Sequence, residues 1–299
     1  MQFSIPASEG VAFTTGQPVA ISPDGSQIVY AANLRLHVRP LAQATATELA
    51  GAFGAGGTAR FPVFSPDGKS IAFWSQADRT IRKVPATGGV SVPLCEVVFP
   101  IGLSWDGDWI LFGHAGGISR VSANGGQSEV IVKLKPEEVG STPRMMPGGR
   151  AVMFSIAPGN TSDVWDTAEI VVQDLTSGER KVLVRGGSDG RYVPTGHLVY
   201  AVGGVLRAAP FDLDRLEVTG GAVPVVLGVQ RVGTRAIAAL STGNAYYSFS
   251  ETGTLIYVPG PVSALGRAGI ALIDRDGNSK RLELPPGAYQ YPRVSPDGT

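Results

Sequence analysis

The chain has 299 residues, of which 43% are hydrophobic and 17% charged, a composition that fits a globular protein and excludes a disordered one. Lysine plus arginine and aspartate plus glutamate number 25 each, so no net charge attracts nucleic acid or an anionic membrane. The single cysteine, Cys95, excludes an intrachain disulfide framework, and we interpret it as a small buried residue rather than a catalytic thiol.

The apolar runs are too short to span a bilayer, so we expect no transmembrane segment in this chain. Residues 1–6 have neither a basic region nor a long apolar core, and we therefore expect no signal peptide. The compartment in which the protein works stays open on these grounds.

A repeated turn motif organises the sequence from its start. Ser-Pro-Asp-Gly followed by an alternating apolar run occurs at residues 22–25 and 65–68, and Ser-Trp-Asp-Gly occurs at residues 104–107. Weaker copies end at Gly149, Gly196 and Gly253, and a seventh copy begins at residues 295–298. The equivalent glycines are 39 to 57 residues apart, which is the period of a β-propeller blade.

Each repeat predicts four strands. Proline fixes the first turn position, aspartate bonds its own backbone and glycine accepts a positive φ, so the motif joins the first strand to the second. Third strands are predicted at 36–41, 80–84, 117–121 and 170–175, and fourth strands at 90–94 and 181–184. No helix-period segment interrupts them, which favours a propeller whose blades bury one another's apolar faces.

We therefore predict an all-β fold, a six-bladed β-propeller of four-stranded antiparallel blades, forming a single domain over residues 1–299. The predicted blades cover about 18–60, 61–98, 99–140, 141–186, 187–235 and 236–286. Residues 287–299 are a partial repeat or a closing strand. Because residues 2–17 also lie outside the repeats, either end is a candidate for closing the ring, and the sequence is compatible with a piece of a longer protein.

The repeats resemble those of TolB-like, WD-like propellers. The likeness is carried by residues 36–41, 81–89, 118–126 and 206–220, and it is nearest to propeller regions that follow the kinase domain of bacterial membrane-anchored serine/threonine kinases. The kinase motifs themselves are absent from this sequence. The resemblance implies a ligand- or protein-binding module in an extracytoplasmic, bacterial setting.

Metal-binding motifs are absent from the linear sequence. His37, His114 and His197 are scattered, without a His-Glu-x-x-His pattern, so we expect no zinc site. The Asp-Gly pairs lack the spacing of a single-loop calcium site, and we interpret them as turn residues. A calcium site assembled from different blades would leave no such motif, and its candidate ligands at the channel mouth are Asp189, Glu96 and Asn244.

Nucleophile and phosphate motifs are also absent. No Gly-x-Ser-x-Gly occurs, and the serines that recur by blade position, Ser22, Ser65, Ser104 and Ser295, are interpreted as fold residues. The carboxylate pairs Asp163/Asp166 and Asp212/Asp214 are interpreted as solvated loop residues. The glycine-rich segment 51–57 lacks a P-loop lysine.

Arginines lead into several first strands, which line the axis of a propeller. A cluster of them at one channel mouth would suit carboxylate or phosphate recognition, although the sequence favours the interpretation that these arginines are solvated and bridge blades. The lead-in residues are Gln17, Arg60, Arg144, Asp189, Arg191, Arg235 and Arg293, and the predicted ligand-binding set is Arg60, Arg144 and Arg191.

Two functions are compatible with these features. The first is a binding module that presents a loop face to a protein or small-molecule ligand, with no cofactor. The second is a calcium-dependent hydrolase of the lactonase or esterase type with its site at the central channel, since six-bladed propellers carry both. The absence of catalytic motifs favours the first.

Overall fold

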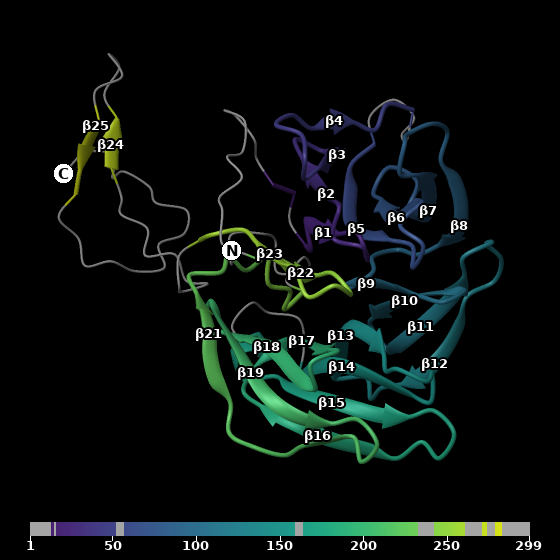
Figure 1. Cartoon of the computed structure of the whole chain (residues 1–299), viewed down its shortest axis with the longest axis vertical. Coiled ribbons are helices and arrows are strands. Elements are labelled where there is room, and N and C mark those ends of the chain that lie inside the picture. The colour runs from purple at the N-terminus through teal and green to yellow at the C-terminus, as the bar shows by residue number, and fades with distance from the viewer. Residues whose placement is uncertain are drawn as a thin grey trace, which may run out of the picture.

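The computed structural model describes residues 13–14, 16–51, 57–158, 164–232, 242–260, 271–273 and 279–282. Within them the chain forms an all-β propeller built from four-stranded antiparallel blades arranged around a centre (Figure 1). The helical content of the described residues is one 3₁₀ turn, η1 (Val164–Asp166), and none of their helices is long and apolar enough to cross a membrane.

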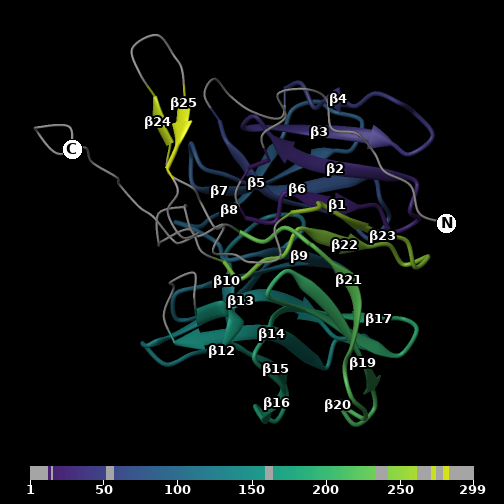
Figure 2. The ribbon, with the colours of Figure 1, turned by 90° about the vertical axis from the view of Figure 1, so that its left-hand side faces the viewer.

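In each of the first four blades the chain runs from the innermost strand to the outermost, and consecutive strands pair (Figures 1 and 2). Blade 1 contains β1 (Val19–Ile21), β2 (Gln27–Ala32), β3 (Arg35–Pro40) and β4 (Thr47–Glu48), and blade 2 contains β5 (Ala59–Phe64), β6 (Ser70–Ser75), β7 (Thr80–Pro85) and β8 (Val92–Glu96). Blade 3 contains β9 (Leu103–Asp106), β10 (Trp109–His114), β11 (Gly117–Ser122) and β12 (Glu129–Lys133), and blade 4 contains β13 (Glu138–Met145), β14 (Ala151–Pro158), β15 (Glu169–Asp174) and β16 (Arg180–Arg185).

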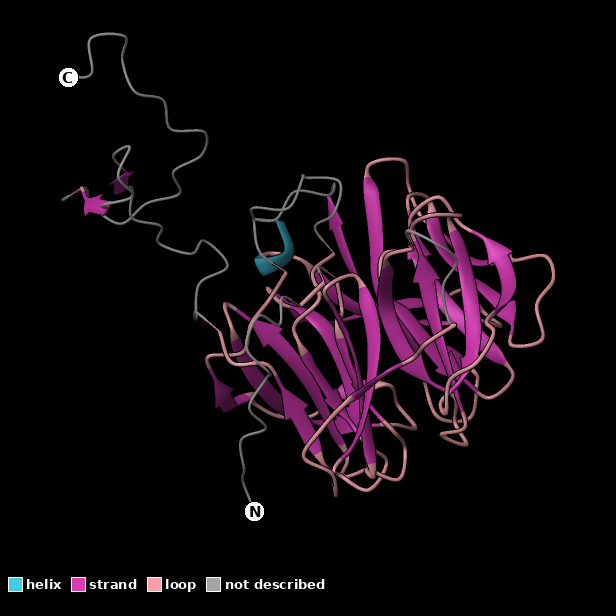
Figure 3. Cartoon of the chain, turned by 90° about the horizontal axis from the view of Figure 1, so that it is seen from above, coloured by secondary structure: helices cyan, strands magenta, loops and turns pink. Residues whose placement is uncertain are grey.

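Blade 5 has a fifth strand. It contains β17 (Ser188–Val193), β18 (His197–Val202) and β19 (Val205–Asp212), after which both β20 (Glu217–Val218) and β21 (Val223–Leu227) pair with the long β19. A two-stranded sheet of β22 (Tyr247–Phe249) and β23 (Leu255–Tyr257) follows. A second hairpin, β24 (Ala271–Ile273) and β25 (Ser279–Arg281), lies apart from the blades in all three views (Figures 1, 2 and 3).

The recurrent turn explains the first hairpin of each blade. In blade 1 the Asp24 carboxylate accepts hydrogen bonds from the Ser22 hydroxyl at 2.5 Å and from the Ser26 N–H at 3.0 Å. The Ser22 hydroxyl accepts one from the Gln27 N–H at 3.0 Å, and Gly25 has a φ of 75° that other residues rarely adopt. Ser22 is thus a turn residue.

The degenerate copy before β23 keeps part of this geometry. The Ser250 hydroxyl accepts the Thr254 N–H at 2.9 Å and contacts the Thr252 hydroxyl at 2.8 Å, so threonine stands where the aspartate stands in blade 1. Gly253 again has a positive φ, of 86°. The turn therefore tolerates loss of both proline and aspartate in this copy, where the serine and the glycine remain.

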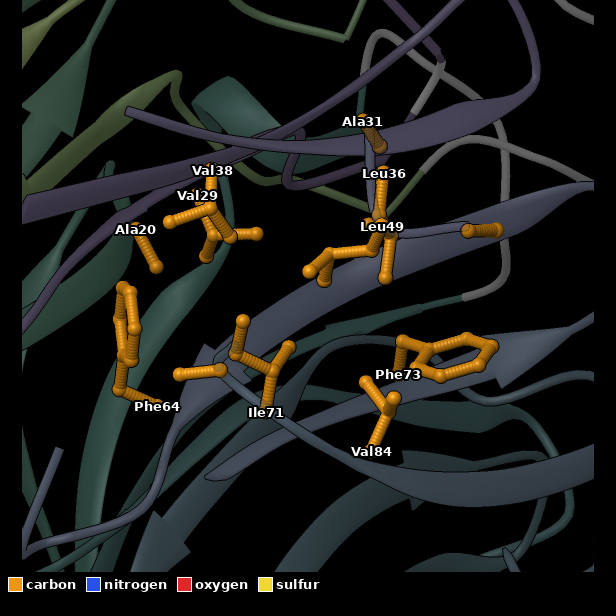
Figure 4. Packing of buried hydrophobic residues seen from close by; sticks show 12 residues of the cluster. Ala20, Val29, Ala31, Leu36, Val38, Leu49, Phe64, Ile71, Phe73 and Val84 are labelled. Atoms are coloured by element: carbon orange, nitrogen blue, oxygen red, sulfur yellow. The ribbon is translucent and has the colours of Figure 1, made fainter. Parts of the chain in front are cut away.

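Apolar contact between blades forms the core. In the contact between blades 1 and 2, Phe64 and Ile71 face Ala20, Val29 and Val38 (Figure 4). Similar clusters join blades 2 and 3, 3 and 4, 4 and 5, and blade 5 with β22 and β23. Each blade thus buries the apolar face of its neighbours, which no single blade can bury alone.

The ring closes between the β22–β23 sheet and blade 1. The Glu251 N–H donates to the Pro23 carbonyl at 2.9 Å, and the Ile21 N–H donates to the Ser248 hydroxyl at 3.4 Å. The first-strand bulges of blades 2, 4 and 5 hold Phe61, Thr142 and Asp189 at positive φ. Such bulges change the direction in which the side chains of these first strands point.

Candidate functional site

The segment 242–246 bonds to residues from several blades. The Thr242 carbonyl accepts from the Ser141 hydroxyl of blade 4, and the Gly243 carbonyl accepts from the Ser188 hydroxyl of blade 5 at 2.7 Å. The Asn244 Nδ2 donates to Gln17 Oε1, just before blade 1, at 3.4 Å. We call the side of the propeller on which the first strands begin the strand-start face, and this segment lies at its middle.

Asp189 holds three parts of the ring together beneath this segment. It is fully buried, at 0% exposure, with a φ of 53°. Its N–H donates to the Ser155 hydroxyl of blade 4 at 2.9 Å, and its Oδ2 accepts the Ala245 N–H at 3.0 Å. Its carbonyl accepts from the Tyr247 hydroxyl. The bulge that strains this residue is therefore stabilised from both neighbouring sheets.

Two predicted ligand-binding arginines meet at Asp189. Arg191 donates from Nε to Oδ1 and from Nη2 to Oδ2, both at 3.3 Å, and its guanidinium lies 4.0 Å from the centre of the Tyr247 ring. Burial alone would lower the pKa of Arg191, but Asp189 and Tyr247 raise it above its ordinary value. Arg144 lies within electrostatic range of both Arg191 and Asp189. These side chains bridge blades 4 and 5 and the β22–β23 sheet.

A second ion pair lies nearer the strand-start face. Arg231, which is buried, bonds through Nη1 to the Asp166 carboxylate and donates from Nη2 to the Ser188 hydroxyl at 3.0 Å. The Asp166 side chain is 41% exposed, so the pair reaches solvent. Asp166 is thus partly solvated, as predicted, but it is also paired with Arg231, which was not predicted. Asp163 lies outside the described residues.

Arg60 stands apart from Arg144 and Arg191. It is half-buried and donates from Nε and Nη2 to Gln76 Oε1 at 3.2 and 3.1 Å. Burial lowers its pKa, and it interacts electrostatically with the buried Tyr246, whose pKa burial raises to about 12. The predicted arginine cluster is therefore divided into two arginines near Asp189, of which Arg191 is buried and Arg144 half-buried, and one arginine on the strand-start face. Arg235 and Arg293 lie outside the described residues.

The candidate calcium ligands are not brought together as a set. Glu96 ends β8, the outermost strand of its blade, and is exposed, whereas Asp189 and Asn244 are fully buried near the centre. Both Asp189 oxygens are engaged by Arg191 and the Ala245 N–H, and two guanidinium groups surround them. This donor set does not fit a divalent cation. Among the described residues, no three His, Cys, Asp or Glu side chains group as metal ligands.

The other residues singled out in the sequence have local partners. His37 stacks on Tyr30 with ring centres 5.1 Å apart, the His114 Nε2 contacts the Ser119 hydroxyl at 2.8 Å, and the His197 Nδ1 contacts the Thr195 carbonyl at 3.0 Å. Burial raises the pKa of the Cys95 thiol to about 11, which opposes a nucleophilic role. A cavity of about 240 Å³ lies far from the centre, at the outer turns of blades 4 and 5 beside Lys181 and Glu217.

Several buried polar atoms around segment 242–246 have no hydrogen-bond partner in the structure. They are Thr242 Oγ1, Asn244 Oδ1, Trp165 Nε1 and Arg231 Nε, with Arg144 Nε and Nη2 deeper in the ring. Sequence reasoning missed Trp165, Ser188, Arg231 and Tyr247, because nothing in their local sequence marks them. Arg144 and Arg191 carry one recognisable signal, since each stands five residues before its turn glycine.

The fold is shared with solved β-propeller structures. A protein assigned as TolB from Agrobacterium tumefaciens has a TM-score of 0.55 and 17% identity, covering 71% of this chain and 80% of that chain. An oligogalacturonate lyase in complex with manganese has a TM-score of 0.53 and 13% identity, covering 81% and 73%. A chain of a nidogen/laminin complex has a TM-score of 0.55 and 12% identity, covering 77% and 84%.

These similarities show a common fold, including that of TolB-like propellers, and nothing finer at such identities. No family model matches the sequence, and no curated protein matches it.

Proposed function

We propose that this chain is a ligand- or protein-binding β-propeller that acts through its strand-start face. The observation that carries the proposal is the convergence of polar side chains from blades 4 and 5, from segment 242–246 and from Gln17, with donors and acceptors left unused. Buried polar groups without partners are expensive, and a ligand or partner that satisfies them gains that free energy. Asp166 and Arg60 give the network access to solvent.

We further propose that the chain forms a single propeller domain with six blades. The packing of the β22–β23 sheet on blade 5 and its hydrogen bonds to blade 1 support a sixth blade at this place, and the hairpin β24–β25 has the sequence pattern of a third and fourth strand. Thirteen residues separate the end of β23 at Tyr257 from Ala271, a connection similar in length to the ten residues between Pro158 and Glu169 in blade 4, where β15 pairs with β14. We propose that β24 pairs with β23 and completes the sixth blade.

The resemblance of the repeats to propeller regions that follow bacterial kinase domains supports a recognition role. In such an arrangement a propeller presents a rigid face to a ligand. The competing function is a calcium-dependent lactonase or esterase. Against it stands the chemistry of the centre, where Asp189 and Asp166 are each paired with an arginine rather than left to coordinate a cation.

A ligand screen by thermal unfolding tests the binding role. Probes are citrate, galacturonate, glucose 6-phosphate and a polyglutamate peptide, because the free donors on this face include arginine and indole N–H groups. We expect at least one probe to raise Tm saturably and to be recovered chemically unchanged. Arg60→Met should weaken the affinity for that probe at least about tenfold by removing a charge-assisted contact.

Arg39→Met is the matched control, because Arg39 lies on β3, away from the segment 242–246, and donates to the Gln43 carbonyl at 2.9 Å. It should leave the affinity unchanged. The binding role is contradicted if no probe shifts Tm, or if the probe is converted to product during the incubation.

A further inference from the structure

Arg144 presents an unused hydrogen-bonding edge inside the ring. Its Nε and Nη2 are sealed from solvent and have no hydrogen-bond partner, although the residue as a whole is only half-buried and keeps a border with solvent. The N–H bonds of Nε and Nη2 lie side by side on a guanidinium and point the same way. Together they form the fork that binds two oxygens of a carboxylate or phosphate.

The neighbouring carboxylate does not fill this edge. Both oxygens of Asp189 are already bonded by Arg191, and Oδ2 also accepts the Ala245 N–H. The nearby Tyr247 hydroxyl donates to the Asp189 carbonyl. Asp189 is therefore held by Arg191 and the Ala245 N–H, and it accepts no hydrogen bond from Nε or Nη2 of Arg144.

The charge of the cluster is unbalanced. It contains two guanidinium groups, Arg144 and Arg191, and one carboxylate, Asp189. Burial, and then the charge of Arg191, lower the pKa of Arg144 to about 10, so it is still charged at neutral pH. An unpaired buried charge costs several kcal/mol unless an opposite charge compensates it.

We propose that the fork of Arg144, with Arg191 beside it, binds an oxyanion, the carboxylate or phosphate group of a small molecule or a free inorganic oxyanion. The bound group supplies one negative charge and two acceptors, which balances the charge of the cluster and satisfies both free nitrogens. This extends the proposed function by naming the chemistry of one site. Its test uses a different variant from Arg60, so either proposal can fail alone.

The test measures Tm in sodium phosphate and in sodium sulfate against sodium chloride of equal ionic strength. At a hundredfold excess over its Kd, the oxyanion should raise the Tm of the wild-type protein by about 4 °C. Arg144→Met should abolish this rise. Without oxyanion the variant should melt no lower than the wild type, because methionine removes the uncompensated charge.

Two further variants keep the result interpretable. Arg144→Lys retains the charge but loses the fork, so its affinity for phosphate should fall at least about tenfold. Arg207→Met, on the third strand of blade 5, should respond to phosphate as the wild type does. Citrate and glucose 6-phosphate are titrated in parallel with inorganic phosphate and sulfate. A lower Kd for either organic molecule indicates that the oxyanion is a group carried by a ligand, whereas a lower Kd for phosphate or sulfate indicates a free ion. Either response supports the site if Arg144→Met abolishes it.

The proposal is overturned by either of two results. One is an equal Tm response to chloride and oxyanions, which reports general screening. The other is the combination of a wild-type Tm that does not respond to oxyanions and an Arg144→Met protein that melts several degrees lower, because Arg144 would then be bonded within the fold.

Discussion

Gly243 occupies a position that only glycine can fill. Its φ is 67°, and a Cβ there would lie 2.6 Å from Cδ2 and Cε3 of Trp165, which is buried. Gly243→Ala should therefore lower the free energy of unfolding by roughly 2–4 kcal/mol through strain and overpacking. Urea denaturation measures this. Gly253 is the control, because it has a φ of 86° but no neighbour within 4 Å of an added Cβ. Gly253→Ala should lower the free energy of unfolding by about 1 kcal/mol. An equal loss in both variants would show that the close approach of Trp165 to Gly243 adds nothing.

Asp189 is the residue on which the inner polar network depends most. Asp189→Ala leaves Arg191 buried without its carboxylate and removes the acceptor of the Ala245 N–H. The expected loss in the free energy of unfolding is about 3–5 kcal/mol. The exposed Asp108 is a matched control whose replacement by alanine should change it by less than about 0.5 kcal/mol. A similar small effect at both positions would contradict the network described above.

The turn residue Asp174 gives the fold a dependence on acid pH. The Ser177 N–H and then Arg150 hold its pKa at about 2, below the ordinary 3.8. Because the folded-state pKa is the lower one, its stabilisation is complete above about pH 4 and is lost as the pH falls toward 2. The difference in unfolding free energy between wild type and Asp174→Asn should therefore shrink across this window. A difference that stays constant from pH 7 to pH 2.5 would contradict the shifted pKa.

At the scale of elements, local chemistry made the hairpins predictable. Serine, aspartate and glycine of the turn bond within six residues of one another, so a single sequence shows them. The centre depends on contacts over much longer separations. Tyr247 bonds to a residue 58 positions earlier, and Asn244 to one 227 positions away, and no local pattern encodes such pairs. This is why Glu96 was grouped with the channel although it lies on an outermost strand.

The proposed pairing of β24 with β23 makes a prediction for hydrogen exchange. A three-residue, two-stranded sheet such as β22–β23 is marginal alone, so a third strand should protect the β23 amides. A chain ending at Gly260 should therefore exchange the amides of Leu255–Tyr257 faster than the full chain does. The amides of β2 in blade 1 serve as the internal reference. Unchanged exchange in β23 after truncation would contradict a sixth blade completed by this hairpin.

At the scale of the whole molecule, the period of the repeats was enough to predict a propeller of four-stranded blades, and the structure confirms that fold. The period says nothing about what the centre binds, because blade packing and ligand contacts use different side chains. The structure adds that Asp189 and Asp166 at the centre are each paired with an arginine, and our proposal of recognition rather than metal-assisted hydrolysis rests on that pairing.

The most direct test of that claim is thermal unfolding in EDTA and in added calcium, run beside an assay of lactone and ester hydrolysis. The account predicts the same Tm in both conditions and no turnover, because ligands that bind only the folded state would raise Tm. A Tm raised by calcium, together with turnover that disappears on chelation, would contradict it and establish a metal-dependent hydrolase.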